Sequence, residues 1–180
     1  MYKMDVMKKI KNFLLINFFF LFCFSTISYS EILKKFNVQG NDRLSDQTIA
    51  IFGDINIDQN YDADDVNLII KKLYETNFFS DIKVDFTSGI LNITVIENPI
   101  INLIIFKGVK AEKYKKQIIE LLELREKTPF VKNSVKKDID QIRRVYRHLG
   151  HYFVKVEAEV QQLEKNRVNL VYSLDVGEKA

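Results

Sequence analysis

The same succession of hydrophobic and polar patterns occurs twice along this chain. Each copy predicts a strand, two helices and two further strands. The first copy opens with an apolar-rich run at residues 32–38, and the second opens with a similar run at residues 100–106. A glycine follows each run, Gly40 in the first copy and Gly108 in the second, and it suits a turn with a positive φ angle. The chain is therefore predicted to contain an internal repeat.

In the first copy, two helices are predicted between the opening strand and a closing hairpin. Ser45 is the expected N-cap of a helix at residues 46–52, and Gly53 is expected to end it. Asp62 or Asp64 is expected to cap the second helix, which is amphipathic. The apolar face of this second helix consists of Val66, Ile69, Ile70 and Leu73.

In the second copy, apolar spacing predicts two further helices, and the longer one stops at Gly150. The residues at helical spacing in the first of them are Tyr114, Ile118, Leu121 and Leu122. The stripe along the second consists of Val135, Ile139, Ile142, Tyr146 and Leu149. Because residues three and four apart share one face of a helix, both helices are expected to bury these side chains.

Each copy closes with alternating positions that predict a hairpin with one buried face. The alternating apolar residues of the first hairpin are Ile82, Val84 and Phe86, then Leu91, Ile93 and Val95. Those of the second are Tyr152, Val154, Val156, Ala158 and Val160, then Val168, Leu170, Tyr172, Leu174 and Val176. We therefore predict an α+β fold of two units, each with two helices packed on a three-stranded mixed sheet. Pro99 between the units predicts a short, stiff joint.

Residues 1–30 have the layout of a secretory signal peptide. A basic start is followed by an apolar run at residues 13–24, and Ser28 and Ser30 stand where a small-x-small cleavage site is expected. The alternative is an uncleaved membrane anchor, but a spanning helix needs about 20 apolar residues, and this run is shorter. We predict an exported chain cleaved after Ser30, which would remove the single cysteine, Cys23.

Cleavage would also change the charge balance of the protein. The basic residues of the removed segment are Lys3, Lys8, Lys9 and Lys11, and its only acidic residue is Asp5. Removing them from 27 basic and 24 acidic residues leaves 23 of each. A protein that binds nucleic acid through the phosphate backbone favours a clear basic excess, so nucleic acid is not an expected partner.

The sequence offers no set of residues suited to catalysis or to cofactor binding. The two histidines, His148 and His151, would need a carboxylate such as Glu157 to complete a metal site, and we favour turn or surface positions for them. Three nearby carboxylates, Asp62, Asp64 and Asp65, lack the glycine and the spaced oxygen ligands of a calcium loop, so helix capping is favoured. We predict a non-enzymatic protein without a metal or a cofactor.

Four motifs resemble a known family. They lie at residues 73–84 (LYETNFFSDIKV), 95–108 (VIENPIINLIIFKG), 146–152 (YRHLGHY) and 167–178 (RVNLVYSLDVGE). Together with the repeated element order, they resemble POTRA domains of the Omp85 superfamily, in the form found in BamA-like outer-membrane protein assembly factors. Asn77, Val109 and His151 depart from the Gly, Asn and Tyr that are usual in this pattern. The resemblance implies a signal peptide at residues 1–30 and POTRA domains at residues 31–98 and 99–180.

The resemblance also implies a function and a location. The chain is expected to lie at the periplasmic face of the outer membrane, where it receives unfolded outer-membrane β-barrel proteins. Periplasmic chaperones and accessory assembly lipoproteins are the other implied partners. Membrane association is expected through a C-terminal barrel that is absent from this chain. We therefore interpret the chain as a fragment of a longer protein. Two alternatives remain open: the POTRA arm of a two-partner secretion transporter, and a cell-division protein with an uncleaved inner-membrane anchor.

An exposed sheet edge gives the most direct physical route to this function, because an extended segment can add to it by backbone pairing. The resemblance implies that the second strand of each unit forms the edge. The candidate client-binding residues are Ile82, Lys83, Val84, Asp85, Phe86, Tyr152, Phe153, Val154, Lys155 and Val156. The alternative is that these are ordinary edges guarded by charged side chains. Arg143, Arg144 and Arg147 form either a solvated helix face or a docking patch for an acidic partner.

Overall fold

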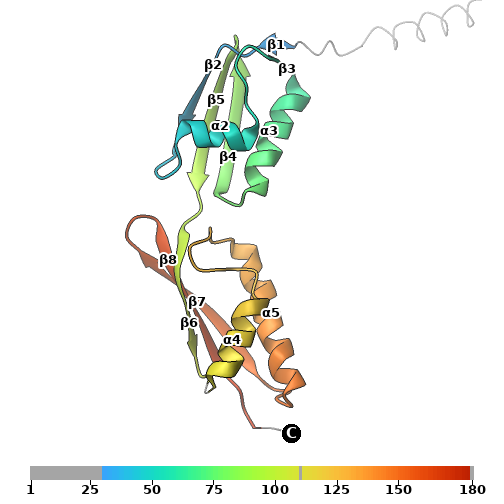
Figure 1. Ribbon diagram of the computed structural model, residues 1–180, viewed down its shortest axis with the longest axis vertical. Helices are drawn as coiled ribbons and strands as arrows, with labels where there is room; N and C mark the ends of the chain where they lie inside the picture. The colour runs from blue at the N-terminus through green and yellow to red at the C-terminus, as the bar shows by residue number, and fades with distance from the viewer. Residues whose placement is uncertain (1–29, 110, 179–180) are drawn as a thin grey trace, which may run out of the picture.

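The computed structural model describes residues 30–109 and 111–178 and shows an α+β fold (Figure 1). Two units follow one another along the chain, and each has its own sheet and its own hydrophobic core. Within the described residues, no helix has both the length and the apolar character needed to cross a membrane. Apart from Ser30, the predicted signal peptide lies outside the described residues.

The first unit contains a three-stranded mixed sheet. Its elements are β1 (Glu31–Ile32), β2 (Lys35–Gln39), α2 (Asp46–Gly53), β3 (Asn60–Tyr61), α3 (Ala63–Glu75), β4 (Phe79–Thr87) and β5 (Ile90–Glu97). The central strand β5 pairs parallel with β2 and antiparallel with β4. The predicted strand at residues 32–38 is divided, because β1 pairs separately with β3 and Leu33 between β1 and β2 is buried in the core.

The helix caps of the first unit were predicted in part. Ser45 caps α2 and accepts the backbone N–H of Thr48 at 3.2 Å, as predicted. The helix also ends at Gly53, as predicted, although the left-handed conformation after it is taken by Asp54 (φ 55°) and not by the glycine. Gly53 is the last residue of the helix, and a Cβ atom there would approach Ile69 to 3.2 Å. Its small size therefore allows α2 to pack closely on α3.

The second unit repeats the arrangement. Its elements are β6 (Ile100–Lys107), α4 (Glu112–Leu121), α5 (Lys132–His148), β7 (Lys155–Leu163) and β8 (Arg167–Asp175). The central strand β8 pairs parallel with β6 and antiparallel with β7. Both helices lie on one face of the sheet (Figure 1). The fold class predicted from the hydrophobic pattern is therefore confirmed.

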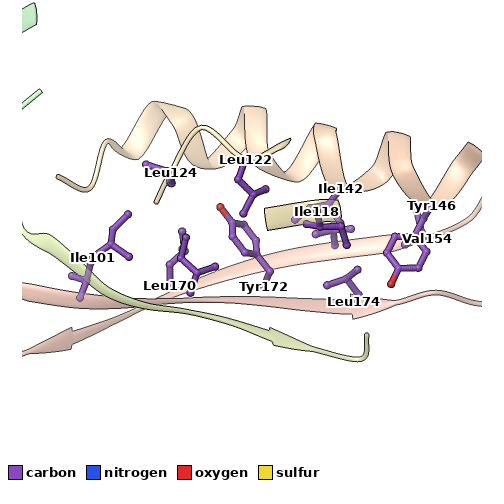
Figure 2. Close-up of a cluster of buried hydrophobic side chains, with 13 residues drawn as sticks. Ile101, Ile118, Leu122, Leu124, Ile142, Tyr146, Val154, Leu170, Tyr172 and Leu174 are labelled. Atoms are coloured by element: carbon purple, nitrogen blue, oxygen red, sulfur yellow. The ribbon is translucent and has the colours of Figure 1, made fainter. Parts of the chain in front are cut away.

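The core of the second unit lies between α5 and the central strand β8 (Figure 2). Ile142 and Tyr146 of the predicted α5 stripe are buried, and the other three stripe residues pack partly buried against the same cluster. Tyr172 and Leu170 of β8 are completely buried beneath them. The prediction for Leu121 is wrong: it is the last residue of α4 and is exposed, whereas Ile118 and Leu122 are buried.

Gly40 and Gly108 confirm the internal repeat in atomic detail. Both have φ of +83°, and both lie directly beside the central strand of their own sheet. A Cβ atom on Gly40 would lie 2.1 Å from the carbonyl oxygen of Val95, and one on Gly108 would lie 2.1 Å from that of Leu174. Both the left-handed backbone and the close approach therefore require glycine.

Hydrogen bonds hold the joint between the units on both sides. The buried Glu97 carboxylate accepts the backbone N–H groups of Arg43 (3.1 Å) and Leu44 (3.0 Å) and the Arg43 guanidinium Nε (2.8 Å). From the second unit, Asn166 donates its side-chain N–H to the backbone carbonyl of Glu97 at 3.1 Å. These hydrogen bonds restrain the joint in addition to the backbone restriction predicted from Pro99.

Candidate strand-binding edges

Both candidate strands lie at sheet edges. In the first sheet the strand order is β2-β5-β4, and in the second it is β6-β8-β7, so within residues 30–109 and 111–178 β4 and β7 each have one unpaired side. The opposite edges are β2, which is only five residues long, and β6. The value of each edge for binding depends on which of its backbone groups remain free.

The outward groups of β4 can be assigned from its turn. The β4–β5 hairpin closes at Thr87 and Ile90 over two residues with positive φ angles, so Thr87 faces β5. Because the facing direction alternates along an antiparallel strand, the outward N–H and C=O groups belong to Ile82, Val84 and Phe86.

The side chains of the same three residues point toward the helices. Ile82 is buried, and Val84 and Phe86 are partly buried against the core. A cavity of about 640 Å³ adjoins the end of this edge, and its walls include Phe86, Val66 of α3 and Tyr61. A strand added beside β4 could therefore direct alternate side chains toward this partly apolar opening between β4 and α3.

The second candidate edge begins three residues later than predicted. β7 begins at Lys155, so the candidate residues Tyr152, Phe153 and Val154 precede the strand. Tyr152 and Phe153 lie in a turn and are 60% and 84% exposed, whereas Val154 is buried. Gly150 (φ 90°) ends the helical segment, and this turn follows before β7 can begin. The alternation of apolar and polar residues therefore continues through a turn, and in a turn it does not indicate which side chains are buried.

β7 is nevertheless the more open edge of the second sheet. The first half of β6 is covered by the loop after α4, where Ile101 donates to Thr128 O (2.9 Å) and Lys127 donates to Ile101 O (2.7 Å). The side chain of Glu126 then accepts the N–H of Ile104 at 3.0 Å. The hydrophobic pattern could not predict this cover, because it depends on how an irregular loop returns to the sheet.

The three candidate arginines lie together on α5. Arg144 and Arg147 are exposed, and Arg143 is partly buried. Arg143 contacts Asp140 at 3.4 Å, and Arg144 donates to the Gln141 side chain at 3.0 Å. These contacts hold two of the three side chains against their own helix, and they leave a basic surface on it.

The sequence pattern does not predict a buried polar cluster that the second unit contains. Asp138 of α5 is completely buried, and its carboxylate accepts the backbone N–H groups of Glu123 and Leu124 and the Tyr172 hydroxyl (2.9 Å). Figure 2 shows the Tyr172 hydroxyl directed from the sheet toward Leu122 and Leu124. Burial raises the pKa of Asp138, although the hydrogen bonds oppose it. Because both of its oxygens have partners, the cluster supports the fold and not a reaction.

The residues weighed as metal ligands take structural positions. Asp62 is the N-cap of α3 and forms a capping box with Asp65, in agreement with the capping interpretation. His151 packs edge-on against Tyr146 with 6.0 Å between ring centroids. Over the described ranges, no three His, Cys, Asp or Glu side chains gather in a way that could hold a metal ion.

Comparisons with known proteins agree with this fold. The family model of POTRA, described as surface antigen variable number repeat, matches residues 99–177. The outer membrane protein assembly factor BamA of Neisseria meningitidis serogroup B is 26% identical over 150 residues, which are 82% of this chain and 19% of that protein. BamA of Neorickettsia risticii is 23% identical over 146 residues, covering 81% of this chain and 20% of its own length.

The chain therefore spans about a fifth of the length of these curated relatives. Among solved structures, the N-terminal domain of Omp85 from the cyanobacterium Thermosynechococcus elongatus is similar, with a TM-score of 0.52 at 14% identity. That similarity covers 80% of this chain and 63% of the other. At this level of identity it shows that the two share a fold.

Proposed function

We propose that the chain is the periplasmic POTRA region of an outer-membrane protein assembly factor. Residues 99–177 match the POTRA family, and about four fifths of the chain is similar to BamA. The chain receives unfolded outer-membrane proteins by adding their extended segments to its sheet edges, and it acts as a binding scaffold, not as an enzyme. In this proposal residues 31–98 and 99–180 form two POTRA domains.

The observation that carries the proposal is the free side of β4. Val84 and Phe86 direct their backbone N–H and C=O groups away from β5, and the side chain of Phe86 borders the partly apolar opening beside α3. Backbone pairing tolerates many client sequences, because it uses groups that nearly every residue has. Lys83 and Asp85 on the other face are exposed and discourage edge-to-edge aggregation.

The remaining partners are proposed for the second unit. The β7 edge, beginning at Lys155 and Val156, offers a second strand-binding site. Arg143, Arg144 and Arg147 offer a basic surface on α5 for an acidic region of a periplasmic chaperone or an accessory assembly lipoprotein. Export by residues 1–30 would place both sites in the periplasm, and a mature N-terminus found at Glu31 would support this.

A pair of substitutions at Val84 tests the edge. Val84→Pro removes an outward N–H that β5 does not use, whereas Val84→Ala shortens the same side chain and keeps the N–H. Binding of a peptide from an outer-membrane-protein strand would be followed by NMR on the mature chain. We expect the amides of Val84 and Phe86 to shift in the Ala variant and in the unchanged chain, and the affinity to fall in the Pro variant. Equal affinity of the two variants, or silent amides at β4, would count against pairing there.

A further inference from the structure

One of the three outward positions of β4 is already occupied by a side chain of the same unit. The backbone N–H of Ile82 donates to the hydroxyl oxygen of Tyr74 at 3.1 Å. Tyr74 lies in the last turn of α3 and is 40% exposed, and its hydroxyl also lies 3.5 Å from Asp81 Oδ1. The Tyr74 side chain therefore reaches from the helix to the free side of the strand.

The start of β4 is also irregular at this point. The register with β5 shifts between Phe79 and Asp81, which marks a bulge in the edge strand. Bulges and covering side chains are both means by which edge strands avoid unwanted pairing. The bulge and Tyr74 therefore leave Val84 and Phe86 as the freely available part of this edge.

The second unit covers an edge in the same way. Glu126 accepts the outward N–H of Ile104 on β6, at 3.0 Å. The two contacts differ in what surrounds them, because β6 is also paired with residues 127–128, whereas the cover of β4 rests on one tyrosine hydroxyl. A single neutral hydrogen bond to an exposed side chain is weak enough for a bound strand to displace.

We propose that Tyr74 is a specificity-determining guard of the β4 edge, an inference that rests on the proposed function of that edge. Its hydroxyl withholds the Ile82 donor, so a client strand pairs first with Val84 and Phe86. A client long enough to reach Ile82 must break the Tyr74 contact. The edge thus favours segments that begin pairing at Val84 and Phe86, beside the partly apolar opening, and disfavours longer edge-to-edge association.

The substitution Tyr74→Phe tests the guard, because it keeps the ring and removes only the hydroxyl. Tyr114→Phe is the matched control, since Tyr114 is partly exposed on α4 of the second unit and belongs to neither candidate edge. Two measurements are needed on the mature chain: amide hydrogen exchange of Ile82 without a ligand, and the affinity for an outer-membrane-protein strand peptide long enough to span residues 82–86.

In Tyr74→Phe, we expect faster exchange at Ile82, a new peptide-induced shift at that amide, and binding that is about two- to tenfold tighter, which corresponds to one net hydrogen bond. Tyr114→Phe should change none of these. Unchanged exchange at Ile82, or faster exchange with unchanged affinity, would overturn the proposed role of Tyr74. In either case, binding of the peptide would still support the proposed function of the edge. If neither protein binds the peptide, the proposed function fails at this edge, and the guard fails with it.

Discussion

Arg43 and Glu97 form an ion pair of 2.8 Å at the point where the first sheet passes into the second unit. The Glu97 side chain is almost completely buried, whereas the Arg43 side chain is about a quarter exposed. The Arg43 guanidinium also donates to the carbonyl oxygen of Asn98 at 2.6 Å. One arginine therefore connects the α2 side of the unit to the residues that lead into the next one.

Replacing Glu97 should make stability less dependent on pH in acid. Burial raises the pKa of this carboxyl, but hydrogen bonds from Leu44 and Arg43 and the Arg43 charge outweigh it, so the pKa lies below its usual value of 4.5. Its contribution is therefore present above about pH 4.5 and is lost as the pH falls through the folded pKa. We expect Glu97→Gln to cost about 1–3 kcal/mol at pH 7 and much less at pH 3, measured by urea unfolding. Glu157→Gln, at an exposed carboxylate, is the control.

Asp138 should show the opposite dependence on pH. Its pKa is raised in the folded state, so the stability it contributes is full below its ordinary value of 3.8 and declines as the pH rises through the folded pKa. Asp138→Asn should flatten this decline in urea unfolding between pH 4 and pH 7. Tyr172→Phe, which removes the hydroxyl partner, should cost about 1–2 kcal/mol. A decline of the same size in wild type and Asp138→Asn would show that another group causes it.

Gly108 should not tolerate a side chain. Gly108→Ala combines a left-handed backbone with a Cβ atom 2.1 Å from the Leu174 carbonyl oxygen, so we expect a loss of about 3 kcal/mol or more in the free energy of unfolding. Gly177 is the matched control, because it also has a positive φ (63°) but no atom within 4 Å of its Cβ position. Thermal unfolding of both variants should separate backbone strain from the clash. Similar losses would mean that the close approach to β8 is relieved at little cost.

Two tyrosines that stand six residues apart should differ sharply when truncated. Tyr146 is 4% exposed in the core of the second unit, and Tyr146→Ala should cost about 3–5 kcal/mol. Tyr152 is exposed in the turn before β7, and Tyr152→Ala should cost about 0.5 kcal/mol or less. Urea unfolding followed by circular dichroism measures both. A loss below 1 kcal/mol for Tyr146→Ala would contradict its place in the core.

The sequence by itself determined the repeat, the helix faces and most of the hairpins. These features depend on local rules: the stripe that contains Ile142 and Tyr146 follows from helical spacing, and the need for Gly108 follows from a turn with positive φ. The same local rules failed at Tyr152 and Phe153, where strand-like alternation continued through a turn, and at Leu121, where a helix end exposed an apolar residue.

Only the tertiary structure decided which edges are open. The cover of β6 comes from residues 127–128 and Glu126, and the contact on β4 comes from Tyr74, in each case through a contact between one element and another. The pairing of Asp138 with Tyr172 likewise joins residues 34 positions apart. Periodicity reports which face of an element is apolar, but it carries no information on which polar groups meet across a loop. Those contacts depend on how the elements pack in three dimensions, and they determine which strand edges are open.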